Sequence, residues 1–251
     1  MTTSDGPELA AGAFSAWLEG MQGALRGDRA SDVPCGGCTA CCTASQFIHI
    51  GPDEADTLAH IPRALLFPAP GRPRGHVLLG YDERGHCPML IDDRCSIYEH
   101  RPRTCRTYDC RIFPATGLGL GLGLGEHAGE DAGDAPGRIA QQARRWRFDV
   151  SAEDDRTRHD GVRAAAAFLS EHRELLPTDV PTNATQLAVL AIEIHEVFLG
   201  RDDANGRATV VVPDRQAVLD AVLARTRADG PGGRSDRVTT DRPPRRGSRR
   251  A

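Results

Sequence analysis

The pattern of apolar and polar residues predicts helices on both sides of a segment of short strands. Near the N-terminus, apolar residues recur at helical spacing from Phe14 to Leu25, which predicts an amphipathic helix over residues 8–26. The same periodicity returns in the second half of the chain. There it predicts helices over residues 139–148, 151–176, 182–199 and 214–226, with a short strand over residues 208–212 before the last of them.

The middle of the chain has shorter apolar runs, which predict small elements. Residues 47–50 read as a strand and residues 52–60 as a short helix opened by proline. Residues 77–81 and 89–91 flank a turn-rich stretch and predict a β-hairpin. A further short helix is expected within residues 97–107. At the start of the 151–176 helix, Ser151 and Asp154 have the spacing of a capping box.

Two segments have compositions that oppose packing. Glycine and leucine alternate strictly over residues 117–125, and glycine at every second position loses much entropy on ordering. We therefore expect an α+β fold in which a small cysteine-rich metal-binding lobe with short strands packs against flanking α-helices. The expected segments are an N-terminal helix (1–33), a cysteine-cluster domain (34–114), a flexible Gly-rich insertion (115–137), a helical region (138–227) and a disordered basic C-terminal tail (228–251).

Composition and charge exclude several classes of function. The net charge is −4, which gives no indication of nucleic-acid binding. All 31 basic residues are arginine, so Schiff-base chemistry and a lysine-bearing phosphate loop are excluded. No apolar run is long enough for a membrane span, and the N-terminus lacks the features of a secretory signal. We therefore expect a cytoplasmic protein, in whose reducing surroundings eight cysteines favour metal ligation or redox chemistry over disulfides.

The densest chemical signal is a run of four cysteines within eight residues: Cys35, Cys38, Cys41 and Cys42. A Cys-x-x-Cys step lets two sulfurs converge on one metal, because small intervening residues fold into a tight turn with free amides. Neighbouring residues point their side chains apart, so Cys41 and Cys42 are poor partners on a single ion. A ferredoxin loop is excluded because Ser45 stands where that loop has its next cysteine.

A second group of cysteines follows at spacings that match no simple zinc finger: Cys87, Cys95, Cys105 and Cys110. Arginines surround this group, and nearby cations lower thiol pKa values and balance thiolate charge. The alternative is that they pair with acidic neighbours. The arginines are Arg94, Arg101, Arg103, Arg106 and Arg111, and the acids are Asp92, Asp93, Glu99 and Asp109.

Together these residues resemble a known family. Three features carry the resemblance: the run Cys35-x2-Cys38-x2-Cys41-Cys42, the Cys87-Pro88 pair, and the segment from Cys95 to Cys110, which includes Arg101-Pro102. They are similar to the bacterial CxxCxxCC cysteine-cluster family (YkgJ-like). This family is labelled zinc- or iron-chelating. The resemblance implies metal binding by these cysteines. The cysteine cluster of a flagellin lysine methylase is also similar, and it implies an iron–sulfur enzyme that uses S-adenosylmethionine.

The leading hypothesis is a metal-binding protein whose eight cysteines hold Zn or Fe ions or an iron–sulfur cluster. An Fe–S-dependent methyltransferase-like enzyme and a structural zinc module for protein–protein interaction remain alternatives. For stoichiometry, two four-thiolate sites are favoured over one four-iron cluster with spare thiols. His49 and His86 lie near the cysteines as candidate ligands, whereas His195 lies on the apolar face of a helix and is interpreted as packed.

Overall fold

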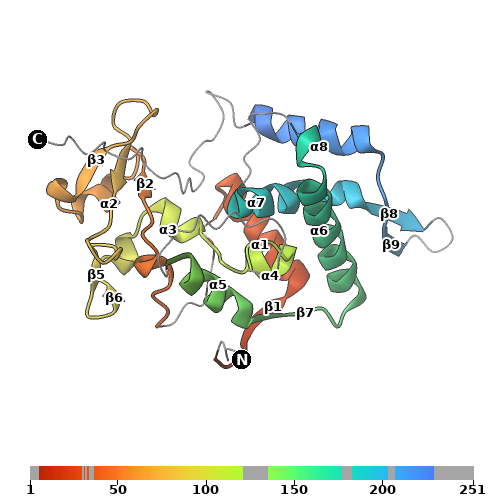
Figure 1. Ribbon diagram of the computed structural model, residues 1–251, viewed down its shortest axis with the longest axis horizontal. Coiled ribbons are helices and arrows are strands. Elements are labelled where there is room, and N and C mark those ends of the chain that lie inside the picture. Colours follow the sequence, from red (N-terminus) through yellow and green to blue (C-terminus); the bar gives the residue numbers. More distant parts are fainter. Residues whose placement is uncertain are drawn as a thin grey trace, which may run out of the picture. The chain divides into compact units, whose positions relative to one another are not determined.

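The computed structural model describes residues 6–29, 31, 33, 37–120, 135–176, 183–202 and 207–228. Its helices and small sheets confirm the α+β class, and the chain divides into two compact units (Figure 1). The helical unit comprises described residues of the ranges 1–36 and 107–235. The other unit, residues 37–106, is called the cysteine lobe below.

The N-terminal segment contributes a strand as well as a helix to the helical unit. β1 (Leu9–Ala13) pairs in parallel with β7 (Trp146–Asp149), and the helix α1 (Phe14–Arg26) begins only after β1. The predictions of one helix over 8–26 and another over 139–148 were therefore wrong at these ends, because α5 (Ala135–Arg145) stops before β7. Aromatic residues of β7 explain the strand, since Phe148 packs edge-on against Phe14 with ring centroids 5.1 Å apart.

Five helices pack around the core of this unit. α6 (Glu153–Glu171) packs on α1 and on α7 (Ala184–Ile194), while α7 also contacts α4 (Ile112–Thr116) and α8 (Arg215–Ala228) (Figure 1). The helix predictions for α6, α7 and α8 are confirmed apart from their ends, whereas α4 was not predicted. The side chains with almost no exposed surface are Phe14, Leu18, Ile112, Leu118, Val162, Leu169, Leu187, Ile192, Val218 and Val222.

The ends of these helices differ from the expected capping. Asn183 caps α7 by accepting a 2.9 Å hydrogen bond from the backbone N–H of Gln186. The capping box predicted at Ser151 is wrong, because Ala152 occupies the cap of α6 and the N–H of Ser151 donates to Asp149 instead. Acidic residues in the first turn of α6 still stabilise the helix, because their negative charges interact favourably with the positive N-terminal end of the helix dipole.

Two short strands follow α7. β8 (Leu199–Asp202) pairs with β9 (Arg207–Val210), which confirms most of the strand predicted over 208–212. The 3-10 turns η4 (Arg173–Leu175) and η5 (His195–Phe198) extend α6 and α7 by about a turn, close to the lengths predicted.

The cysteine lobe contains a three-stranded antiparallel sheet in the order β2-β4-β3, formed by β2 (Ile48–Ile50), β4 (Val77–Leu79) and β3 (Leu66–Pro68). The helix α2 (Ala55–Ala59) and the 3-10 turn η2 (Arg63–Leu65) connect β2 to β3. The buried core of the lobe is small. It consists of Ile50, Ile61, Leu79, Met89 and Ile97, with Cys87 and Cys95 packed partly buried against it.

The hairpin predicted between residues 77–81 and 89–91 was wrong in its pairing. β4 pairs with β2 and β3, whereas β5 (Leu90–Ile91) pairs with β6 (Arg94–Cys95). Asp92 and Asp93 form the two-residue turn between these strands, and both have positive φ, as a type I′ turn requires. The short helix predicted within 97–107 is divided into the 3-10 turn η3 (Tyr98–His100) and the helix α3 (Arg103–Thr107).

The Gly-Leu insertion is described only at its start. α4 ends at Gly117 in the left-handed conformation, and Leu118 and Leu120 are buried. The rest of the insertion up to residue 134, and the predicted basic tail from residue 229, lie outside the described residues.

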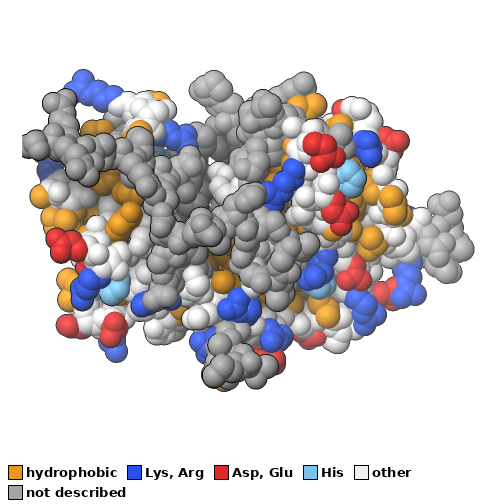
Figure 2. Space-filling view, viewed as in Figure 1, with side chains coloured by type: hydrophobic (Ala, Val, Ile, Leu, Met, Phe, Trp, Pro, Cys, Tyr) orange, Lys and Arg blue, Asp and Glu red, His pale blue; other side chains and the backbone are white. Residues whose placement is uncertain are grey.

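The exposed surface carries both charged and hydrophobic side chains. Among the described residues, no helix combines the length and apolarity needed to cross a membrane. On the face seen in Figure 2, charged side chains of both signs and hydrophobic side chains are interspersed. In the cysteine lobe, Phe67 and Tyr81 are each about two-fifths exposed and pack around Phe47.

Gly161 lies where α6 meets the start of β8, and it provides the first prediction. A Cβ at this position would lie 2.6 Å from Cδ2 and 3.2 Å from Cγ of Leu199. Gly161→Ala should therefore lower the free energy of unfolding by about 1–3 kcal/mol through overpacking, although alanine favours helices. Gly137→Ala in α5, where nothing lies within 4 Å, is the control and should be neutral or slightly stabilising in urea unfolding. Equal stability of the two variants would contradict this packing.

Candidate metal centre

The structure places most of the predicted ligands in one unit. Cys38, Cys41, Cys42, Cys87, Cys95 and Cys105 belong to the cysteine lobe, whereas Cys110 is buried in the helical unit. Cys35 lies outside the described residues. No disulfide joins any two of the seven described cysteines.

Backbone hydrogen bonds bring Cys42 and Cys87 together. Cys42 lies in the 3-10 turn η1 (Cys41–Thr43), and its carbonyl accepts a 2.7 Å hydrogen bond from the N–H of Cys87. A second bond of 2.9 Å joins the N–H of Ser45 to the carbonyl of Gly85. Gly85 has a φ of 80°, and a Cβ there would collide with Oγ of Ser45, so this close approach requires glycine.

Cys95 and Cys105 reach the same region from two further elements. Cys95 lies on β6 opposite Leu90, so the tight β5–β6 hairpin sets its position. Cys105 lies on α3, which two contacts hold to the lobe. Oγ1 of Thr104 donates a 2.7 Å hydrogen bond to the carbonyl of His49, and the N–H of Arg103 donates to the buried carboxylate of Glu54 at 2.5 Å.

Four of these thiols interact electrostatically. Burial of its sulfur raises the pKa of Cys105, although part of the residue is exposed at the surface, and the charges of Cys87, Cys42 and Cys95 raise it further. Burial likewise raises the pKa of Cys87, with a smaller contribution from Cys95. Four segments far apart in the sequence thus present their thiols to one region.

The arginines do not have the predicted effect on these two thiols. Arg101 opposes the increase in the pKa of Cys105 but does not outweigh burial, so the expectation of lowered pKa values was wrong for Cys87 and Cys105. Other contacts engage the arginines. The guanidinium of Arg101 lies 3.9 Å from the ring centroid of Tyr98, and Arg103 and Arg111 form ion pairs with Asp53 and Asp109.

The sulfurs are neighbours without forming a closed ligand cage. A tetrahedral zinc site with Zn–S bonds of about 2.3 Å needs sulfurs about 3.8 Å apart. Within the described part of the chain, no three cysteines have sulfurs within 4.8 Å of one another. The ligand atoms of Asp56, His60 and His100 do lie within 4.8 Å of one another. Metal binding by the cysteines therefore requires their sulfurs to move closer together.

The histidines of the sequence analysis have different surroundings. His49 is buried and stacks on His76, with 3.0 Å between its Nε2 and Nδ1 of that ring. His195 is packed, as interpreted, with its Nδ1 2.7 Å from the carbonyl of Ile192 and its pKa lowered by burial. His60 and His100 were missed, although Asp56 and His60 have the i, i+4 spacing that places side chains on one helix face.

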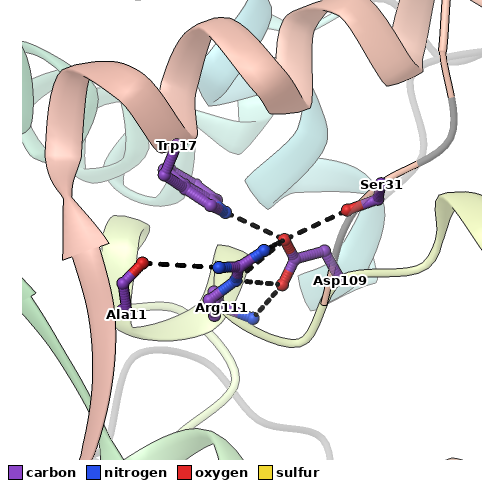
Figure 3. A network of polar contacts seen from close by, with 5 residues as sticks. All are labelled: Ala11, Trp17, Ser31, Asp109 and Arg111. Carbon is purple, nitrogen blue, oxygen red and sulfur yellow. Dashed lines mark hydrogen bonds and ion pairs between the residues drawn. The ribbon is translucent and has the colours of Figure 1, made fainter. Parts of the chain in front are cut away.

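A buried ion pair holds the chain on either side of Cys110. Asp109 and Arg111 are almost fully buried, and the carboxylate of Asp109 accepts hydrogen bonds from Arg111 at 2.8 to 3.0 Å (Figure 3). The same carboxylate accepts from Nε1 of Trp17 at 2.9 Å and from Oγ of Ser31 at 3.2 Å. Nη1 of Arg111 donates in turn to the carbonyl of Ala11. Asp109 thus ties α1 and the segment that leads to the first cysteines to the loop of Cys110.

Residues 34–118 match the model of the CxxCxxCC family, whose description is "Putative zinc- or iron-chelating domain". This segment is similar to that domain, and it contains all eight cysteines. The resemblance drawn from the cysteine spacing is confirmed at the level of this family, and its description supports metal binding. Comparisons with curated proteins and with solved structures gave no match.

Loss of the Asp109 carboxylate should destabilise the helical unit. In Asp109→Ala the guanidinium of Arg111 would remain buried without its counter-ion, which should lower the free energy of unfolding by about 3–5 kcal/mol. Urea unfolding followed by tryptophan fluorescence measures this, because Trp17 and Trp146 both lie in the helical unit. The control is Asp28→Ala, which breaks the exposed pair with Arg26 and should cost at most about 1 kcal/mol. Similar losses in both variants would contradict the role given to Asp109.

Proposed function

We propose that the protein binds zinc or iron through its cysteine sulfurs, with the cysteine lobe as the principal site. The observation that carries the proposal is the convergence of thiols from η1, the segment after Gly85, β6 and α3. The four thiols that interact electrostatically are Cys42, Cys87, Cys95 and Cys105. The proposed ligands also include Cys35, Cys38, Cys41 and Cys110.

The electrostatics of the site favour a cation. Thiolates gathered in a partly buried region repel one another, which is why the neighbouring cysteines raise the pKa of Cys105. A divalent metal removes this repulsion by binding the thiolates directly, and the thiol protons are released to solvent. Sulfur donors select zinc, iron–sulfur clusters and other soft or borderline metals over magnesium and calcium.

The adjacent pair Cys41 and Cys42 supports more than one metal. Both residues are half-buried in the 3-10 turn η1, where consecutive side chains point in different directions. A single tetrahedral ion therefore does not readily accept both sulfurs. Two four-thiolate sites would use every cysteine, and a single four-iron cluster with spare thiols is the competing arrangement.

Metal content measures both the binding and the stoichiometry. We expect the anaerobically purified chain to contain either two metal ions without sulfide or about four irons with four sulfides, with a visible absorption band only for iron. Cys42→Ser should remove about half of the metal if there are two sites. Cys105→Ser should also lower metal content, because its sulfur lies among three other thiols.

Glu83→Gln is the control for these variants, since it changes an exposed residue of the turn before Cys87 without removing a sulfur or a candidate ligand. It should leave metal content unchanged. Absence of bound zinc or iron from the purified chain, together with failure to take up either metal under anaerobic reducing conditions, would contradict metal binding by the cysteines. One ion per chain with four thiols still open to alkylation would contradict the two-site arrangement.

The metal-free lobe should lose stability as pH rises. Because folding raises the pKa of Cys87 and Cys105, the folded lobe keeps protons that the unfolded chain releases above about pH 8.5. The free energy of unfolding should therefore be constant near neutral pH and fall as the pH rises above about 8.5. Urea unfolding in chelator and reductant, followed by near-UV circular dichroism of the lobe tyrosines Tyr81 and Tyr98, measures this.

Two comparisons distinguish the thiols from other causes. Cys105→Ser should reduce the pH dependence, because one of the two shifted groups is lost. The metal-loaded protein should not show this decrease, because its cysteines are already thiolates. An unchanged slope in Cys105→Ser would assign the pH effect to other groups.

A further inference from the structure

A second group of metal-ligating side chains lies in the cysteine lobe and uses no sulfur. Asp56 lies in α2 and His60 one turn later at its C-terminal end, so both are on one face of the helix. His100 ends the 3-10 turn η3, more than 40 residues further along the chain, and its ring stacks on His60 with 3.6 Å between centroids. One ligand atom from each of the three residues lies within 4.8 Å of the others.

Asp56 orients both rings. Nδ1 of His60 is 2.8 Å from the backbone carbonyl of Asp56, and Nδ1 of His100 is 2.8 Å from its carboxylate. Since both oxygens only accept, each neutral imidazole carries its proton on Nδ1 in the metal-free protein. A metal bound by the carboxylate of Asp56 would replace the hydrogen bond from His100, and the proton of that ring would move to Nε2.

The charge of the group also suits a cation. The hydrogen bond from His100 is the main cause that lowers the pKa of Asp56, so this carboxylate is ionised at neutral pH. Arg106 adds a smaller lowering, and its positive charge weakens the attraction for a metal without removing it. All three side chains are substantially exposed, so a bound ion would keep open positions for water.

We propose that Asp56, His60 and His100 form an exchangeable site for a divalent first-row transition ion, with Zn²⁺ as the probe. Two imidazoles and one carboxylate are a donor set that zinc and ferrous iron accept while keeping a free coordination position. The site is separate from the sulfur ligands of the proposed function and does not depend on them, because its donors are nitrogen and oxygen.

Nitrogen-15 NMR of the histidine rings in the full-length chain tests the site directly. On titration with Zn²⁺ under reducing conditions, the ring signals of His60 and His100 should shift together and saturate at the same added zinc. His172 is an internal control: its Nδ1 is 3.1 Å from the carbonyl of Phe168, four residues earlier, but its ring stacks on Phe168 instead of a second imidazole. Its signal should stay unchanged.

Variants show whether the three residues act as one site. Asp56→Asn and His100→Gln should each weaken the zinc response of His60 by roughly tenfold or more. Cys105→Ser should leave the response intact, which separates this site from the cysteines whatever metal they hold. Circular dichroism confirms that each variant is folded. Ring signals that do not move with millimolar Zn²⁺, or a His60 response that is unchanged in His100→Gln, would overturn the proposal.

Discussion

The small hydrophobic core of the cysteine lobe is the constraint on which the rest of the site depends. Five buried residues are few for a unit that spans residues 37–106, and burial of apolar area alone gives such a unit little stability. Polar contacts therefore position the ligands: a backbone bond from Cys87 to Cys42, a type I′ turn before Cys95, and the contacts of Thr104 and Glu54 beside Cys105. Metal–sulfur bonds would add the stability that the core lacks.

Cys110 has surroundings of a different kind. Its neighbours Asp109 and Arg111 form a buried ion pair in the helical unit, where desolvation makes charges costly unless every hydrogen-bonding group is used. Here Trp17 and Ser31 use the remaining capacity of the carboxylate. A buried ion pair of this kind fixes the positions of its two residues more than it adds to the free energy of unfolding. The carboxylate of Asp109 thereby fixes the positions of both the loop that holds Cys110 and the segment around Ser31 that leads to the first cysteines.

The sequence predicted long periodic helices and the family well, and local pairing poorly. α6, α7 and α8 follow from apolar spacing, and the spacing of the eight cysteines is specific enough to indicate the family whose model matches residues 34–118. The strands β1 and β7 were missed because each is stabilised by a partner more than 130 residues away, which no local pattern records. The hairpin at Asp92-Asp93 was missed because aspartates replace the glycine that marks such turns.

The same limit applies to the chemistry of the site. Spacing identified the thiols, but burial decided their pKa values, and burial is a property of the fold. His60 and His100 meet only because α2 and η3 are brought together, so the sequence shows at most the pair of Asp56 and His60. Sulfur and imidazole donors also differ in kind. Thiolates select soft and borderline metals, whereas imidazole and carboxylate donors accept zinc and ferrous iron with an open coordination position. A lobe with both kinds of donor would be able to take up a metal without opening its sulfur site.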